Sequence, residues 1–153
     1  MSSRLIVQFA KAPRDGFVKT RMQPYLNVHE ARSLHESLVK YCSRQLVLSG
    51  LANVQLWVDF DPGHALFQFC KGIGIQEIQV QCGSDLGERM FDCFRRTLSD
   101  YRSVVLVGSD CPDIDTDYLT AAFSALESVP LVFGPAFDGG YVLIGAKEIN
   151  KEL

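Results

Sequence analysis

Basic side chains gather in a polar stretch that follows the first apolar run of the sequence. Residues 10–21 carry four cations, namely Lys11, Arg14, Lys19 and Arg21. Phosphate groups bind to cations and to free backbone N–H groups, and Gly16 lets the backbone approach a ligand closely. The stretch contains neither the GxxxxGK(S/T) nor the GxGxxG pattern. It is therefore consistent both with a phosphate-binding loop and with a solvated basic loop.

An aspartate follows the most apolar run of the chain after two small residues. Residues 104–107 are followed by Gly108, Ser109 and Asp110. A carboxylate in this place can hold Mg²⁺ or Mn²⁺ against phosphate oxygens, because these hard cations take oxygen ligands. The other interpretation is a cap of the next helix, but Asp113 and Asp115 are better placed for that. We therefore favour a metal-binding role for Asp110.

A second carboxylate, Asp138, follows another apolar run and precedes Gly139 and Gly140. Asp-Gly-Gly between two strands is also a good hairpin signal, so a turn alone explains it fairly well. If Asp138 lies on a loop beside Asp110, the two carboxylates make a divalent-metal site that diphosphate and water complete.

Arg89 is a candidate anion ligand in a predicted helix. It lies in the first turn, where the helix N-terminus favours anions and the guanidinium adds a planar fork of donors. The other interpretation is an exposed Arg89 paired with Glu88 or Asp92, and the sequence does not separate the two.

Apolar periodicity predicts the elements that must position these residues. Strands are expected over 5–9, 54–60, 75–80, 104–107, 131–133 and 141–144. Helices are expected after the capping residues Asn27, Asp85 and Asp115, with a short one over 62–71. This alternation predicts one α/β domain over residues 1–153, a three-layer αβα sandwich. Its sheet is mostly parallel, with an antiparallel strand near the C-terminus. In such sheets ligands bind beyond the carboxyl ends of the strands, where the basic stretch and Asp110 lie.

Charge and composition exclude several classes of protein. The net charge of −3 argues against broad nucleic-acid binding, which needs a basic face. The apolar run 5–10 is too short for a membrane span or a secretory signal. The five cysteines form no CxxC pair, which fits a reducing, cytoplasmic location better than a disulfide framework or a zinc site. His29, His35 and His64 fall in or near helical segments and are expected at the surface.

Four segments together resemble a known family. They read FAKAPRDGFVKTRM, GSDLGERM, VVLVGSDCPDI and GPAFDGGYVLIG. They resemble the small glycosyltransferase-like proteins called radical-SAM/selenodomain-associated transferases. More distantly they are similar to the deazaflavin-cofactor guanylyltransferases and the molybdenum-cofactor nucleotidyltransferases. The resemblance implies the nucleotide-diphospho-sugar transferase fold of the GT-A type. Members of this family usually continue for several elements beyond the last matched segment, and the chain is expected to lack these.

The resemblance also implies roles for particular residues. Asp110 would be the metal aspartate of the DxD-like position, which here reads Ser-Asp-Cys, and Asp138 would lie beside it. We expect Asp110, Lys19 and Arg21 to be the catalytic residues. The expected nucleotide-binding residues are Ala10, Lys11, Arg14, Gly16, Lys19, Arg21, Arg89, Gly108 and Ser109.

The sequence therefore predicts a transferase that depends on Mg²⁺ or Mn²⁺. It would bind a nucleotide or nucleotide-sugar donor and pass a glycosyl or nucleotidyl group to a small-molecule acceptor. The alternative is a nucleotide-binding module of the same fold without turnover. A phosphatase of the haloacid dehalogenase type is disfavoured, because that class carries its nucleophilic aspartate where this chain has Ala10 and Lys11.

Overall fold

β1 (Ser2–Ala10) lies inside a six-stranded sheet with the strand order β3-β2-β1-β4-β6-β5. The computed structural model describes residues 2–22 and 25–149. The other strands are β2 (Asn53–Val58), β3 (Glu77–Val80), β4 (Tyr101–Val107), β5 (Leu131–Pro135) and β6 (Tyr141–Ala146). β1 to β4 are parallel, whereas β6 runs antiparallel to both of its neighbours, β4 and β5. The predicted sheet, mostly parallel with one antiparallel strand, is confirmed.

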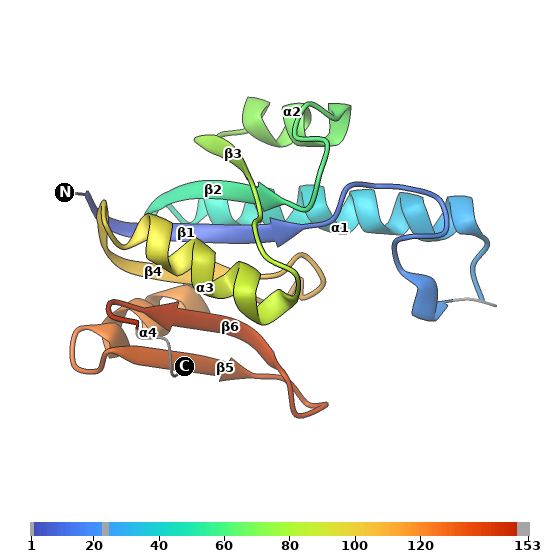
Figure 1. Cartoon of the computed structure of the whole chain (residues 1–153). Coiled ribbons are helices and arrows are strands. Elements are labelled where there is room, and N and C mark those ends of the chain that lie inside the picture. The colour runs from blue at the N-terminus through green and yellow to red at the C-terminus, as the bar shows by residue number, and fades with distance from the viewer. Residues whose placement is uncertain (1, 23–24, 150–153) are drawn as a thin grey trace.

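Helices cover both faces of this sheet (Figure 1). The helices are α1 (Val28–Leu48), α2 (Ala65–Gly72), α3 (Leu86–Thr97) and α4 (Thr116–Leu126), with a 3-10 turn η1 (Thr20–Met22) in the loop after β1. Buried residues of α1, α2 and α4 join one core, and those of α3 join the other. The three-layer αβα arrangement is therefore confirmed. Within the described residues, no helix is long and apolar enough to cross a membrane.

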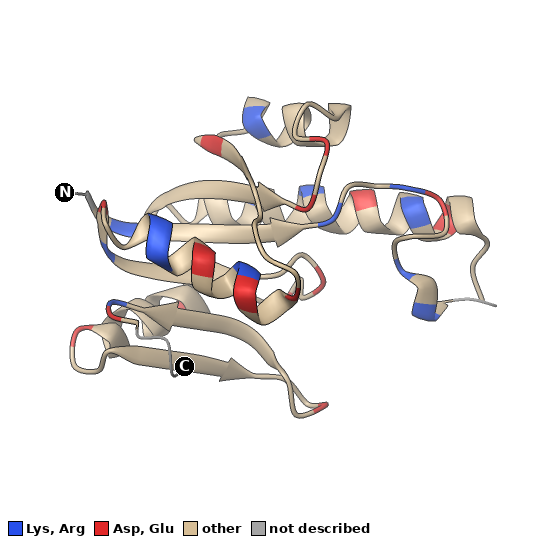
Figure 2. Ribbon diagram, in the orientation of Figure 1, with Lys and Arg blue, Asp and Glu red and all other residues tan. Residues whose placement is uncertain are grey.

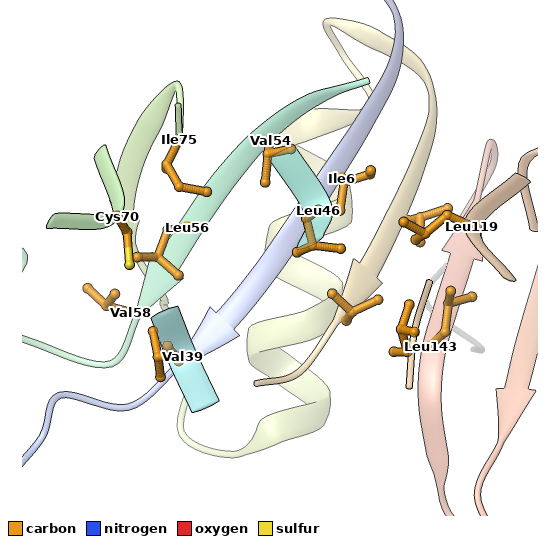
Figure 3. Close-up of a cluster of buried hydrophobic side chains, with 14 of the residues drawn as sticks. Ile6, Val39, Leu46, Val54, Leu56, Val58, Cys70, Ile75, Leu119 and Leu143 are labelled. Carbon is orange, nitrogen blue, oxygen red and sulfur yellow. The ribbon is translucent and has the colours of Figure 1, made fainter. Parts of the chain in front are cut away.

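Alternation along β1 explains why it can face two cores at once. Ile6 and Ala10 join the core beneath α1, whereas Leu5, Val7 and Phe9 join the core beneath α3. Successive side chains of a strand point to opposite faces, so a strand that is apolar on both faces, as β1 is over residues 5–10 apart from Gln8, belongs between two helical layers. Figure 3 shows the larger core, in which Val39 and Leu46 of α1 face strand residues such as Ile6.

The helix starts agree with the caps expected from the sequence. Asn27 and Glu30 form the predicted capping box, with the side chain of each accepting from the backbone N–H of the other at 2.8 and 3.1 Å. Asp85 accepts from Glu88 N–H at 2.8 Å, and Asp115 accepts from Tyr118 N–H at 2.9 Å. These contacts span three residues, so local sequence decides them.

The buried side of α1 differs from the predicted one. Apolar spacing predicts one helical face with Leu34, Leu38, Tyr41, Cys42 and Leu46. Cys42 and Leu46 are buried, whereas Tyr41 is 43% exposed and the buried set also includes His35, Val39 and Ser43. The prediction was wrong for Tyr41 and missed His35 and Ser43. These two polar residues find hydrogen-bond partners inside the protein, which removes the cost of burying them.

His35 also corrects the expectation that all three histidines lie at the surface. It is 4% exposed. The side chain of His29 is 71% exposed, and His64 caps α2 by accepting from Leu66 N–H at 3.0 Å. That cap also moves the start of α2 from the predicted residue 62 to Ala65.

Candidate functional site

A cleft of about 880 Å³ opens at the edge of the sheet where β1 to β4 end. Ala10 is the last residue of β1, Asp59 follows β2, Gln81 follows β3 and Gly108 follows β4, and all four line the cleft. The cleft therefore lies at the carboxyl ends of the parallel strands, where the sequence placed the site. The lining includes the predicted residues Ala10, Lys11, Lys19, Arg21, Arg89, Gly108, Ser109 and Asp110.

Opposite charges meet in this cleft. Figure 2 shows Lys and Arg along the loop after β1 and on η1, and acidic residues on the loop after β4. The Lys19 ammonium forms an ion pair with the Asp110 carboxylate. The side chain of Lys19 is 13% exposed and that of Asp110 is 75% exposed, so the carboxylate stays open to a ligand. Lys19 also has a positive φ of 53°, a backbone conformation uncommon outside glycine.

Contacts of Ala12 and Arg14 hold the loop after β1 in place. The backbone N–H of Ala12 donates to Asp59 Oδ1 at 2.7 Å. The guanidinium of Arg14 lies 4.1 Å from the ring centroids of both Phe17 and Phe60. Cation–π contacts of this kind hold the loop against the chain that follows β2. Arg14 therefore holds the loop in place. Neither Arg14 nor Gly16 is among the residues that line the cleft.

His35 ties the same loop to α1. Its Nε2 lies 2.7 Å from the carbonyl oxygen of Lys11. A carbonyl only accepts, so Nε2 carries the hydrogen and Nδ1 is the atom that titrates. Burial lowers the pKa of His35 below its ordinary value of 6.5, and the positive charge of Lys19 acts in the same direction. His35 is therefore neutral at pH 7 and lines the cleft as a hydrogen-bond donor to the loop.

Arg89 lines the cleft, and two nitrogen atoms of its guanidinium group already donate hydrogen bonds within the protein. Its Nε donates to the Gly83 carbonyl at 3.0 Å and one terminal nitrogen donates to Gln81 at 3.4 Å. Glu88 instead accepts from Ser84, and Asp92 pairs with Arg95 and Arg96. The alternative pairing of Arg89 with Glu88 or Asp92 is therefore not the one seen.

Asp138 lies in the turn between β5 and β6. Its Oδ1 accepts from Gly140 N–H at 3.0 Å, which is the turn contact that the sequence left as an alternative. Val107, the last residue of β4, pairs with Leu143, so the hairpin continues past the end of β4. Its tip projects away from the loop after β4 in Figure 1. Asp138 is not among the cleft-lining residues, and its sharing of a metal with Asp110 stays a prediction.

Sequence reasoning missed several residues of the cleft lining, among them the polar residues Asp59, Gln81 and His35. Gln81 directly follows β3, so the rule that ligands bind beyond strand ends could have found it. Asp59 fell inside the strand predicted over 54–60, whereas β2 ends at Val58 and leaves Asp59 in the loop. No local pattern marks His35, because its partner, the Lys11 carbonyl, lies 24 residues away in the chain.

The fold and the cleft define a class of protein. The chain has the fold of nucleotide-diphospho-sugar transferases. A protein from Desulfovibrio desulfuricans G20, provisionally assigned as such a transferase, superimposes with a TM-score of 0.83 and 33% sequence identity over 96% of this chain. The chain belongs to the family described as uncharacterized protein conserved in bacteria (DUF2064), which matches residues 42–153. The match includes Asp110 and Asp138 but not the basic loop.

More distant neighbours share the fold. A CMP:2-keto-3-deoxy-manno-octonic acid synthetase in complex with CTP gives a TM-score of 0.56 at 15% identity, over 86% of this chain and 52% of its own. A cytidylyltransferase from Leptospira borgpetersenii gives 0.57 at 13% identity, over 96% of this chain and 61% of its own. The chain spans 64% of the length of the Desulfovibrio protein. No curated protein matches it.

Proposed function

We propose that the chain is a metal-dependent transferase that binds the diphosphate of a nucleotide-activated donor in the cleft. The observation that carries this proposal is the meeting of Lys11, Lys19 and Arg21 with Asp110 in one cleft at the carboxyl edge of the sheet. Several cations beside one carboxylate suit a ligand with several negative charges and a divalent ion. The CTP complex of one structural neighbour and the transferase assignment of another support a nucleotide as that ligand.

Asp110 is the residue that would hold Mg²⁺ or Mn²⁺. Its carboxylate is exposed and already binds one cation, the Lys19 ammonium. Among the described residues, no three His, Cys, Asp or Glu side chains gather in a group that could hold a metal. A single carboxylate fits an ion that arrives with its diphosphate, because Mg²⁺ often takes one or two carboxylates plus phosphates and waters. When bound, such an ion neutralises charge on the phosphate oxygens.

The residues of the cleft would act mainly by position and charge. Lys11 and Arg21 would neutralise the donor's phosphates, and Arg89 has donors left for an anion beyond the two contacts that it makes. A small acceptor would then attack a sugar carbon, which releases a nucleoside diphosphate, or the α-phosphorus, which releases diphosphate from a nucleoside triphosphate. Both reactions need a site that binds a diphosphate.

A thermal-shift panel tests this proposal. Nucleoside mono-, di- and triphosphates and sugar nucleotides are added to the protein with and without Mn²⁺. A ligand at about 100 times its Kd stabilises the native state by about 2.7 kcal/mol, so a true ligand raises the Tm visibly. We expect at least one nucleotide to do so only with Mn²⁺. If none shifts the Tm, the proposal fails. Binding without turnover of any labelled donor would instead support a binding module.

A further inference from the structure

Gln8 is a polar residue in an otherwise apolar strand. It lies on β1 between Val7 and Phe9 and is 0% exposed. An amide buried without partners costs a few kcal/mol, so a glutamine at this place needs a compensating set of hydrogen bonds. By alternation along the strand it faces the same side as Ile6 and Ala10, which is the side of α1.

Both the NH₂ group and the oxygen of the Gln8 side-chain amide have hydrogen-bond partners. Its Nε2 donates to the Val39 carbonyl at 3.3 Å and to Ser109 Oγ at 2.9 Å. Its Oε1 accepts from Ser43 Oγ at 2.6 Å. The amide orientation is fixed by chemistry, because the Val39 carbonyl can only accept and must therefore face the NH₂ group. The amide thus connects β1 and α1 with the loop after β4.

Ser109 extends this hydrogen-bond network from the core to the cleft. Its hydroxyl accepts from Gln8 and donates to the Phe9 carbonyl at 2.7 Å, while the Cys42 thiol donates to the Ser109 carbonyl at 3.4 Å. Burial raises the pKa of Cys42 to about 11, so this thiol keeps its hydrogen at neutral pH. Ser109 is thereby held from three sides, and the next residue is Asp110, whose exposed carboxylate meets Lys19.

We propose that Gln8 is a positioning residue that holds the loop of residues 108–110 where Asp110 faces the cleft. Gln8 does not touch the cleft itself and is not among its lining residues. The positioning is a property of the fold alone. Its consequence for ligand binding rests on the proposed function, so the two are measured separately.

The positioning is tested by hydrogen exchange with a matched control. Gln8→Met keeps the unbranched shape and removes the amide. Gln55→Met makes the same change at another buried glutamine, which lies on the adjacent strand β2 and accepts from Trp57 Nε1 at 2.9 Å. We expect the backbone amides of residues 109–111 to exchange about tenfold faster in the Gln8 variant than in the Gln55 variant, the scale of one lost hydrogen bond. Equal exchange in the two variants overturns the inference.

A second variant keeps the test decisive if Gln8→Met does not fold. Ser109→Ala breaks the same hydrogen bond from the loop side and should raise exchange over residues 109–111 in the same way. Where both single variants fold, the double variant should exchange no faster than the faster single one, because the two changes remove one shared contact. Fully additive effects, or unchanged exchange in Ser109→Ala, contradict a Gln8–Ser109 link.

Calorimetric titration with UDP, GDP and CDP in the presence of Mn²⁺ gives the separate binding readout. For a nucleotide that binds the wild type, Gln8→Met should weaken the affinity about tenfold and Gln55→Met should not. If no nucleotide binds the wild type, the proposed function fails, and the exchange experiment still decides whether Gln8 positions the loop. If exchange rises but affinity is equal in both variants, Gln8 does not position the loop for binding, and the inference fails in that part.

Discussion

The ammonium group of Lys19 lies on the carboxylate of Asp110, and the two residues come from loops that follow the adjacent strands β1 and β4. The Lys19 ammonium uses one oxygen of the Asp110 carboxylate, and that carboxylate neutralises the charge of the ammonium. A divalent cation at Asp110 competes with the Lys19 ammonium for the carboxylate, and a phosphate at Lys19 competes with the Asp110 carboxylate for the ammonium. Metal and diphosphate relieve this competition together, so the proposed site should bind them cooperatively.

The first prediction concerns this coupling. Mn²⁺ alone should shift the Tm little, a nucleotide alone should shift it little, and both together should shift it by more than the sum. Linkage requires that each ligand raise the affinity of the other by the same factor. A calorimetric titration of Mn²⁺ at zero and at saturating nucleotide measures that factor. Identical Mn²⁺ affinities in the two titrations would rule out a shared site.

The second prediction concerns the charge of Asp110. Asp110→Asn keeps the shape of the side chain but loses the charge that offsets a divalent cation, so nucleotide binding should no longer depend on Mn²⁺. Asp113→Asn is the matched control, because Asp113 is an exposed carboxylate in the same loop and does not line the cleft. Isothermal calorimetry with and without Mn²⁺ measures both. Equal loss of metal dependence in the two variants would remove Asp110 from its proposed role.

The third prediction concerns Arg21, an exposed cation on η1 in the cleft lining. Arg21→Ala should weaken nucleotide binding by about 1–3 kcal/mol, the scale of a lost charge-assisted hydrogen bond. Stability should hardly change, because the side chain is exposed. Arg102→Ala is the control, since Arg102 is also exposed but lies near the start of β4, at the opposite edge of the sheet. Calorimetry that shows equal affinity in both variants and the wild type would end the phosphate role of Arg21.

The fourth prediction concerns pH and His35. Burial lowers its pKa in the folded protein below 6.5, so well above pH 6.5 the imidazole is neutral in the folded and unfolded chains alike. As the pH falls below that value, the unfolded chain takes up a proton and the folded one does not, and stability is lost until the folded pKa is passed. Urea unfolding of the wild type and of His35→Phe between pH 5 and pH 8 measures this loss. We expect a shallower pH dependence in the variant, and an equal slope would show that His35 is not its source.

The fifth prediction concerns Gly83, which precedes α3 with a φ of 146°. A Cβ there would lie 2.8 Å from the Arg89 backbone nitrogen, so Gly83→Ala should destabilise the fold by about 1–3 kcal/mol and disturb Arg89. Gly87→Ala is the matched control, because its Cβ would meet nothing closer than 3.4 Å and alanine favours a helix. Urea unfolding of both variants measures the difference. Similar stabilities would mean that the loop relaxes without cost.

Much of the fold could be predicted because its causes are local in the chain. The apolar run 104–107 indicated a strand, and the caps Asn27, Asp85 and Asp115 each bind a residue three positions away. Parallel strands joined by helices place their carboxyl ends at one edge, so the cleft beside Lys11 and Asp110 also followed from the pattern.

Only the tertiary structure decided the contacts between segments far apart in the chain. The sequence placed both Lys19 and Asp110 in the site, but their ion pair joins residues 91 positions apart, and the Gln8–Ser109 bond spans 101. The face that α1 buries was also decided this way, because His35 and Ser43 are polar and enter the core only where Lys11 and Gln8 offer partners. Periodicity measures hydrophobicity along one helix and carries no information about partners on another element. Hydrogen bonds between elements therefore set the details of this site, while local patterns set its location.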